Sequence, residues 1–398
     1  MSLSFLQLSD VHFDAPLRAG KLRLDSRRAS QRERERREAF RAAFALVKVR
    51  NLDGVLIPGD LFDDELVKSD TLRFVAEILA SIAPKPVFLA PGNHDAYGGV
   101  SPYRQEQGEG TRDFRWPENV QLFAHEDFRS VSWPQRPEIS VTACGVAANL
   151  PSSLRRLASP VERPRSEIPI LLFHGSRDDG GYLQSQKATY PFSEDELRAQ
   201  GFAWTALGHY HQHQVLHGAS GVAIGAYSGS LLAAGLDELG QKGALVVELD
   251  ESGPHPEFVP LDPRELRVVD CELSSCTYMD AAQARVEEAL GQSGAREQDL
   301  VYLKLSGRRA RGLELGFLEE IASRYFHFVS DLSHLTPDVD LDRYPPLSEA
   351  RTTEERFVAQ LRQRLKESEG EEAETVRRAL LYGLDALSTG RLDSHYEA

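Results

Sequence analysis

Short apolar segments recur along the first two thirds of the chain, and each is followed by a polar or glycine-containing turn. Five of them have the length and composition of buried strands: residues 5–8, 55–57, 87–89, 170–173 and 204–207. Apolar positions recur at helical spacing over residues 39–47, within a helix predicted at residues 26–49. Strands alternating with helices from residue 1 to about 262 predict a layered α/β domain.

A proline-rich stretch, with Pro254, Pro256, Pro260 and Pro263, marks a predicted domain boundary. The segments after it predict a small βαβαβ unit: strand 266–273, helix 278–290, strand 300–305, helix 313–325 and strand 326–330. We therefore assign residues 1–262 to a first domain, residues 263–340 to a small α+β domain and residues 341–398 to a linker with a helical hairpin.

The hairpin is predicted from two apolar stripes at helical spacing. The stripes consist of Phe357, Leu361 and Leu365, and of Val376, Leu380, Leu384 and Leu387. Because so short a hairpin is not expected to bury both stripes by itself, it either docks on the rest of the chain or binds a partner helix.

Two basic segments allow two interpretations each. The front half of the long helix, residues 32–37, is expected to be a solvated, ion-paired face, with contact to phosphate groups as the alternative. The segment Gly307–Gly312 is expected to be a mobile solvated loop, with a clamp on a phosphate backbone as the alternative.

The composition and net charge argue against several classes of protein. The chain has 398 residues and 41% hydrophobic content, and it contains no apolar run of the roughly 20 residues that span a bilayer. No secretory signal is recognisable at its start, so we expect a cytoplasmic protein. Its three cysteines have no metal-binding spacing and are expected to be buried hydrophobic residues. The net charge of −15 argues against non-specific binding of polyanions, although a local basic face is compatible with it.

Candidate metal ligands directly follow the five predicted strands. They are Asp10, His12, Asp60, Asn93, His174, His209 and His211. Because strands of an open α/β sheet carry their following loops to one edge, these side chains are expected to meet there. Asp60 is the candidate bridge between two divalent ions about 3.5 to 4 Å apart, which would share a hydroxide nucleophile. The coordination of one ion would be completed by Asp10, His12 and His211. The coordination of the other would be completed by Asn93, His174 and His209.

His94 follows a proposed ligand but would point toward the substrate. We expect it to act as the general acid that protonates the leaving oxygen. Asp95 is expected to orient this imidazole and to raise its pKa by its opposite charge. Mixed imidazole, carboxylate and amide ligands suit manganese, iron or zinc, and manganese is our first expectation.

These motifs resemble those of the calcineurin-like metallophosphoesterases. Within that superfamily the chain is most similar to the SbcD-type DNA repair nucleases, particularly their YhaO-like branch. The similarity is carried by residues 8–17, 206–211, 226–230, 240–243 and 378–384. The pattern of the related nucleases has proline at the position of Ser228. We expect the site to tolerate serine there, because serine is also a turn residue. The resemblance implies a four-layer αββα sandwich, a capping domain that orients DNA, and a helical tail.

The resemblance also implies partners and an activity. The tail would dock on the coiled coil of an SMC-like ATPase subunit, and helices of the phosphoesterase domain would form a homodimer. The expected function is a two-metal DNA exonuclease and endonuclease in DNA repair. The alternatives are a phosphodiesterase for a cyclic nucleotide or another small molecule, which the acidic balance favours, and a scaffold subunit of the ATPase complex.

Overall fold

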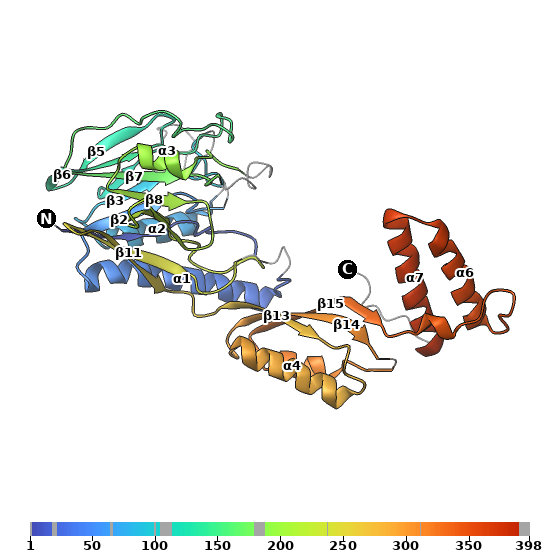
Figure 1. Ribbon diagram of the computed structural model, residues 1–398. Helices are drawn as coiled ribbons and strands as arrows, with labels where there is room; N and C mark the ends of the chain where they lie inside the picture. The colour runs from blue at the N-terminus through green and yellow to red at the C-terminus, as the bar shows by residue number, and fades with distance from the viewer. Residues whose placement is uncertain are drawn as a thin grey trace. The chain divides into compact units, whose positions relative to one another are not determined.

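The computed structural model describes residues 2–17, 22–63, 67–98, 101–103, 114–178, 188–236, 238–310 and 312–389. The chain divides into two compact units, Met1–Glu265 (unit 1) and Leu266–Ala398 (unit 2), shown in Figure 1. Each unit is described by itself. None of the helices within the described ranges is both long and apolar enough to cross a membrane.

The first sheet of unit 1 has the strand order β12-β11-β1-β2-β3-β4. Its strands are β1 (Leu3–Gln7), β2 (Gly54–Pro58), β3 (Val87–Ala90), β4 (Val120–Leu122), β11 (Gly243–Asp250) and β12 (Gly253–Pro260). Strands β1 to β4 run parallel, whereas β11 and β12 are antiparallel additions at one edge. Helices α1 (Ser26–Val49) and α2 (Ser69–Ala80) cover the outer face of this sheet through a continuous apolar core.

The second sheet has the order β5-β6-β7-β8-β10-β9. Its strands are β5 (Arg129–Trp133), β6 (Arg136–Ala143), β7 (Ile168–His174), β8 (Trp204–Gly208), β9 (Gln214–His217) and β10 (Ala223–Tyr227). An apolar core that includes Phe5, Phe88 and Trp204 lies between the two sheets. Helix α3 (Glu194–Ala199) packs on the outer side of the second sheet through Leu197. The predicted αββα sandwich is confirmed.

Three residues of the charged front half of α1, Arg32, Glu35 and Arg36, are buried, so the prediction of a solvated face is wrong for them. The predicted ion pairing is confirmed, and Arg34 is exposed. Arg32 is 0% exposed and binds Asp262 with both guanidinium NH groups, at 2.8 and 2.7 Å. Glu35, 7% exposed, accepts from Arg32 at 2.9 Å and from Arg264 at 2.7 Å. The reason is tertiary: the last residues of unit 1 fold back onto α1 and enclose its charged side chains.

The Glu35 carboxylate should make stability depend on pH. Burial would raise the pKa of Glu35, but hydrogen bonds from Arg264 and Arg32 and their positive charge hold it below its usual value. A lowered folded-state pKa stabilises the protein above the unfolded-state pKa, and this stabilisation is lost as the pH falls through the folded-state value. The loss of unfolding free energy in Glu35→Gln should therefore be largest at pH 7 and shrink in acid. Urea unfolding of the wild type and the variant at pH 7 and at an acidic pH measures this loss of unfolding free energy. An equal loss at the two pH values would contradict the interpretation.

Unit 2 contains the predicted βαβαβ arrangement. Its elements are β13 (Leu266–Glu272), α4 (Met279–Ser293), β14 (Leu300–Arg309), α5 (Phe317–Ser323) and β15 (His327–Pro337). The three strands are parallel, in the order β13-β14-β15, and pack on both helices through one apolar core. Whether this part of the chain acts as a capping domain stays a prediction.

The basic segment Gly307–Gly312 is not simply a mobile loop. Gly307, Arg308 and Arg309 continue strand β14 and pair with β15. Arg309 is largely buried and donates to Asp385 at 2.8 Å. Arg311 lies outside the described residues. The loop prediction is therefore wrong for the first half of the segment, because β15 is long enough to pair with it.

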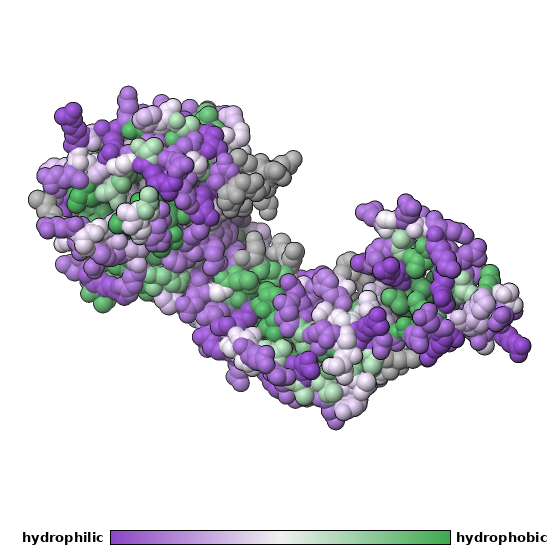
Figure 2. Space-filling model, viewed as in Figure 1, coloured by the Kyte–Doolittle hydropathy of each residue, from purple (hydrophilic) through white to green (hydrophobic). Residues whose placement is uncertain are grey.

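The tail forms α6 (Thr353–Glu367) and α7 (Gly370–Thr389), as predicted. Val358, Leu380 and Leu384 are fully buried between them and are joined by Tyr344 of the preceding segment. Figure 2 shows apolar residues gathered along this hairpin. The hairpin thus closes a small core within unit 2, which favours docking on the chain itself.

The three cysteines are buried and unbridged, as predicted.

Candidate metal centre

Both sheets contribute to the site through the carboxyl ends of their parallel strands. In the first sheet, Asp10, Asp60 and Asn93 follow β1, β2 and β3 within three residues of each strand end. In the second sheet, His174 is the last residue of β7, and His209 directly follows β8. The two sheets face each other, so the loops after these strands converge at one edge of the sandwich.

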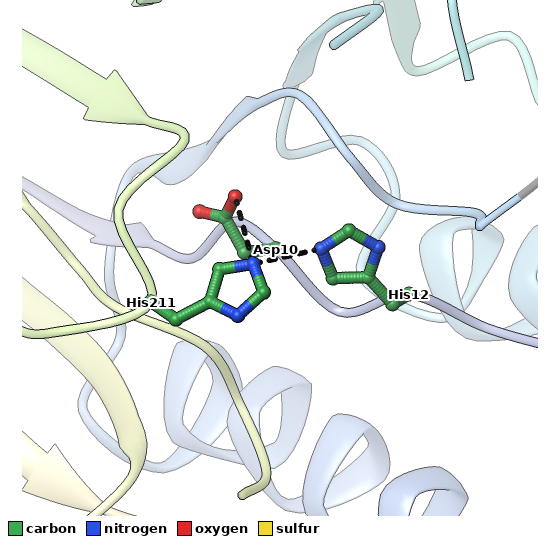
Figure 3. Close-up of side chains that lie close together, drawn as sticks. All are labelled: Asp10, His12 and His211. Atoms are coloured by element: carbon green, nitrogen blue, oxygen red, sulfur yellow. Dashed lines mark hydrogen bonds and ion pairs between the residues drawn. The ribbon is translucent and has the colours of Figure 1, made fainter. Parts of the chain in front are cut away.

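One donor set consists of Asp10, His12 and His211. Figure 3 shows the two imidazoles turned toward each other, with the Asp10 carboxylate beside them. The Nε2 atoms of His12 and His211 lie 3.1 Å apart, and His211 Nε2 lies 4.0 Å from Asp10 Oδ1. The donor atoms of these three residues all lie within 4.8 Å of one another, which is the size of a single-cation site.

The second donor set surrounds Asn93. Its Oδ1 atom lies 2.9 Å from His174 Nε2 and 3.0 Å from His209 Nδ1. Asp60 Oδ2 lies 3.4 Å from His174 Nε2 and 3.8 Å from His12 Nε2, so this carboxylate faces both donor sets. The structure thus brings together all seven predicted ligands and places the Asp60 carboxylate between the two donor sets.

The backbone of the site has an unusual conformation. Asp10, His12, Asp60 and His209 all have positive φ angles, of 53°, 50°, 51° and 111°. Side chains other than glycine adopt such angles at a cost of about 1–3 kcal/mol each, and such residues cluster at functional sites. Gly92 completes the packing, because a Cβ atom there would lie 2.2 Å from Asp60 Oδ1. The positive φ angles thus cost stability but place the donor atoms at the edge of the sheets.

The ring nitrogens that point away from the centre are held by hydrogen bonds. His12 Nδ1 donates to Asp63 at 3.1 Å, His174 Nδ1 to the Pro58 carbonyl at 2.8 Å and His211 Nδ1 to Glu238 at 2.7 Å. Such bonds fix the ring orientation and leave the other nitrogen available to a metal ion.

His94 lies at the rim of the site. Its side chain is 46% exposed, whereas those of His12 and His174 are 10% and 0% exposed. Its Nδ1 atom is 3.2 Å from Asp63 Oδ1, and this contact raises the pKa of His94 to about 9. The imidazole is therefore protonated near neutral pH, as a general acid must be.

The predicted role of Asp95 needs a correction. Asp95 is fully buried and accepts hydrogen bonds from Gly92 N–H at 2.7 Å, Phe62 N–H at 3.0 Å and the Tyr103 hydroxyl at 2.5 Å. It therefore holds the shape of the loop that carries Asn93 and His94. The carboxylate that contacts the His94 ring is Asp63, because the loop turns Asp95 into the core.

Burial and neighbouring charges shift the pKa values of several groups in the site. Burial would raise the pKa of Asp60, but the nearby His174 and His12 hold it below its usual value. Burial and the charge of His174 lower the pKa of His209 to about 4, which keeps this ring neutral. Burial would lower the pKa of His211, but the hydrogen bond from its ring to Glu238 raises it to about 9. Metal binding at His211 would consequently release a proton.

Sequence reasoning missed several residues that support the ligands. Asp63 follows Asp60 by three residues, and this spacing within one turn was the available signal. Glu238, by contrast, has no local signal, because it reaches His211 only through the fold. Ser228 is buried 2.9 Å from the Ser9 hydroxyl, which in turn hydrogen-bonds Asp10. The departure from proline at this position thus adds a hydroxyl group next to a ligand.

The residues present fit divalent metal ions. Two carboxylates and four imidazoles converge with an amide oxygen, and the distal nitrogens of three imidazoles are already engaged. A mixed nitrogen and oxygen set of this kind is typical of first-row divalent metals, and it does not select one of them.

Comparisons with known proteins agree with this geometry. Residues 3–213, more than half of the chain, match the family model of the calcineurin-like phosphoesterases. A relative from Bacillus subtilis (strain 168), described as the uncharacterized metallophosphoesterase YhaO, is 24% identical over 259 residues. This match covers 64% of the chain and 60% of the relative, so the chain spans less than two thirds of that protein's length.

Two of the solved structures that match this chain share little sequence identity with it. TT1561 of Thermus thermophilus matches at 14% identity and a TM-score of 0.35, over 65% of this chain and 99% of that one. A dimetal phosphatase from Danio rerio matches at 11% identity and a TM-score of 0.38, over 65% and 99% of the two chains. The family match, the αββα sandwich and the convergence of carboxylates and imidazoles at its edge lead to one conclusion: this chain belongs to the calcineurin-like phosphoesterase family.

Proposed function

We propose that this protein is a two-metal phosphodiesterase that cleaves DNA as an exonuclease and endonuclease in DNA repair. The observation that carries the proposal is the pair of adjoining donor sets with the exposed His94, in contact with Asp63, at their rim. The similarity of its motifs to those of SbcD-type nucleases supports DNA as the substrate. Manganese is the metal we propose, with iron or zinc as alternatives.

The protein residues have separate tasks in this proposal. When bound, two divalent ions supply a water nucleophile at neutral pH and a positive clamp on the phosphoryl oxygens. His94 donates its Nε2 proton to the leaving oxygen, while Asp63 holds the ring through Nδ1. Arg36 donates to the carbonyl oxygen of His12 at 2.7 Å and so keeps the first ligand loop in its strained conformation.

The proposal is tested with end-labelled linear DNA, single-stranded and double-stranded, in the presence of manganese. Wild-type protein should degrade the DNA, and Asp60→Ala should not. The variant should also lose the rise in melting temperature caused by manganese, because a ligand at 100 times its Kd stabilises the fold by about 2.7 kcal/mol. Asp127→Ala, whose side chain is 93% exposed, is the matched control and should behave as wild type. Full DNA cleavage by Asp60→Ala would contradict the site.

The net charge of −15 favours one competing substrate class, a cyclic nucleotide or another small phosphodiester. The salt dependence of binding distinguishes a DNA substrate from a small phosphodiester. Binding to a DNA backbone releases counterions, so its affinity falls steeply as salt increases. Manganese-dependent hydrolysis of an aryl phosphodiester without any cleavage of DNA would favour the small substrate.

The proposed partners are an SMC-like ATPase subunit and a second copy of the chain. Since α6 and α7 bury most of their apolar stripe against each other, an ATPase would contact outward positions such as Leu387, which is 47% exposed. A cytoplasmic location is part of the same proposal. The complete set of donor residues argues against a scaffold without catalytic activity.

A further inference from the structure

The cations of helix α1 fall into two classes. The first class is paired with carboxylates. It comprises Arg28 with Asp25, Arg32 with Glu35 and Asp262, Arg36 with Glu33, and Arg37 with Asp70. Arg50, the C-cap residue, pairs with Glu257 in the same way. These pairs hold the helix to its own surroundings.

The second class consists of Arg27, Arg34, Arg41 and Lys48. All four side chains belong to exposed residues, and none forms an ion pair with a carboxylate of the described ranges. Arg41 lies over the ring of Phe74, with its guanidinium carbon 4.7 Å from the ring centre. In a chain with 61 acidic and 46 basic residues, these four exposed cations give one helix a local basic excess.

These four residues, which we name the basic row, recur every seven positions. Seven residues rise about 10.5 Å along a helix, so the row is about 31 Å long. The drift of about 20° per seven residues keeps its members on one side of the helix. Glu38 is the carboxylate that shares this side, between Arg34 and Arg41, and the side faces away from the sheet that α1 covers.

We propose that the basic row binds the phosphate backbone of DNA. This inference rests on the proposed function and extends it by naming a substrate-binding surface outside the metal centre. A straight row of about 31 Å is close to the length of one turn of duplex DNA, about 34–36 Å. Arginine and lysine contacts to phosphates fix the register of a protein on DNA without reading its sequence.

The row also belongs to the element that supports the site. Arg36, on the same helix, donates to the backbone carbonyl of His12, so α1 contacts the loop that carries a candidate ligand directly. The paired cations face the protein and the basic row faces outward. Four local charges can thus hold a polyanion on a protein whose total charge is −15, because screening limits repulsion from distant carboxylates to about 8–10 Å.

The test measures binding of a fluorescent 30-base-pair duplex to the full chain by anisotropy, across a series of salt concentrations without manganese. In Arg27→Gln/Arg34→Gln/Arg41→Gln, the slope of log K against log salt should fall by up to about 2.7, since each phosphate contact contributes about 0.9. A second variant, Arg27→Glu/Arg34→Glu, leaves the Arg41–Phe74 contact intact. The matched control for the triple variant, Arg198→Gln/Arg324→Gln/Arg378→Gln, also lowers the net charge by three, at arginines that are ion-paired elsewhere on the surface.

Manganese-dependent hydrolysis of an aryl phosphodiester should be unchanged in all three variants. Weaker DNA binding in the two α1 variants alone supports the inference. A wild-type salt slope in both α1 variants, or an equal loss in the control, overturns it while DNA cleavage by the wild type stands. If the wild type hydrolyses the aryl ester but neither binds nor cleaves DNA, the inference and the DNA part of the proposed function fail together.

Discussion

Replacing His94 with alanine is expected to lower kcat for DNA cleavage by about 10²–10⁴-fold, the usual contribution of a general acid. The imidazole is protonated near neutral pH because Asp63 raises its pKa to about 9, and its exposed ring lies at the rim of the donor sets. The backbone N–H of His94 donates to Asp60 at 2.9 Å, and alanine retains this bond. The His94 ring also lies within 4.8 Å of donor atoms of His12 and Asp60, but it is the most exposed of the three side chains. Metal content, measured by elemental analysis, should therefore stay at the wild-type value.

Substrates with different leaving groups distinguish a general-acid role of His94 from a structural role. A nitrophenolate leaves without protonation, whereas the sugar oxygen of DNA needs a proton, so His94→Ala should lose far less activity on a nitrophenyl phosphodiester than on DNA. Asp63→Asn serves as a comparison, because it removes the charge that holds the ring but keeps the ring itself. Equal losses of His94→Ala on both substrates would refute the acid role, and loss of metal would assign His94 to the donor set.

Replacing Arg32 with alanine is expected to lower the free energy of unfolding of unit 1 by about 3–5 kcal/mol. Breaking a buried ion pair from one side leaves its partner charge without compensation. Here Asp262 is 0% exposed on its side chain, and Glu35 loses one of its two arginine partners. Tryptophan fluorescence during urea unfolding reports this change specifically, since Trp116, Trp133 and Trp204 all lie in unit 1.

Arg28 provides the matched control on the same helix. Its ion pair with Asp25 is exposed, with side chains 40% and 49% accessible. Surface pairs of this kind contribute about 0–1 kcal/mol, so Arg28→Ala should change stability little. An Arg32→Ala variant no less stable than Arg28→Ala would show that the buried network contributes nothing to the fold.

Local patterns were sufficient for most of the elements. Helix α1 begins and ends at the predicted residues 26 and 49, because the apolar spacing of its second half is regular and Asp25 caps its first turn. The parallel strands of unit 1 were recognisable as short apolar runs because both faces of each are buried. The strand ends of unit 2 were less predictable: β14 continues through Gly307–Arg309, and β15 continues to Pro337, because each provides backbone partners for the other.

The candidate ligands were predictable for a related reason. Asp10, Asp60, Asn93, His174 and His209 each follow a recognisable strand at a short distance, and the parallel order of the strands brings their ends together. The structure contradicts the predicted contact of Asp95 with the His94 ring, which Asp63 makes instead. The sequence separation between Asp95 and His94 is smaller than that between Asp63 and His94, but the direction of each side chain depends on the turn that carries it.

The sequence by itself determined helix α1, the strands that precede the candidate ligands, the elements of unit 2 and the residues that converge at the sheet edge, because these follow from periodicity and from the order of strands and loops. The αββα sandwich was predicted from the resemblance to the family. Only the tertiary structure decided which charges are paired. Arg32 meets Asp262 across 230 positions, and His211 meets Glu238 across 27, through contacts that no local pattern encodes. The same folding left Arg27, Arg34 and Arg41 exposed, because whether a charge is buried or solvated depends on what packs against its helix.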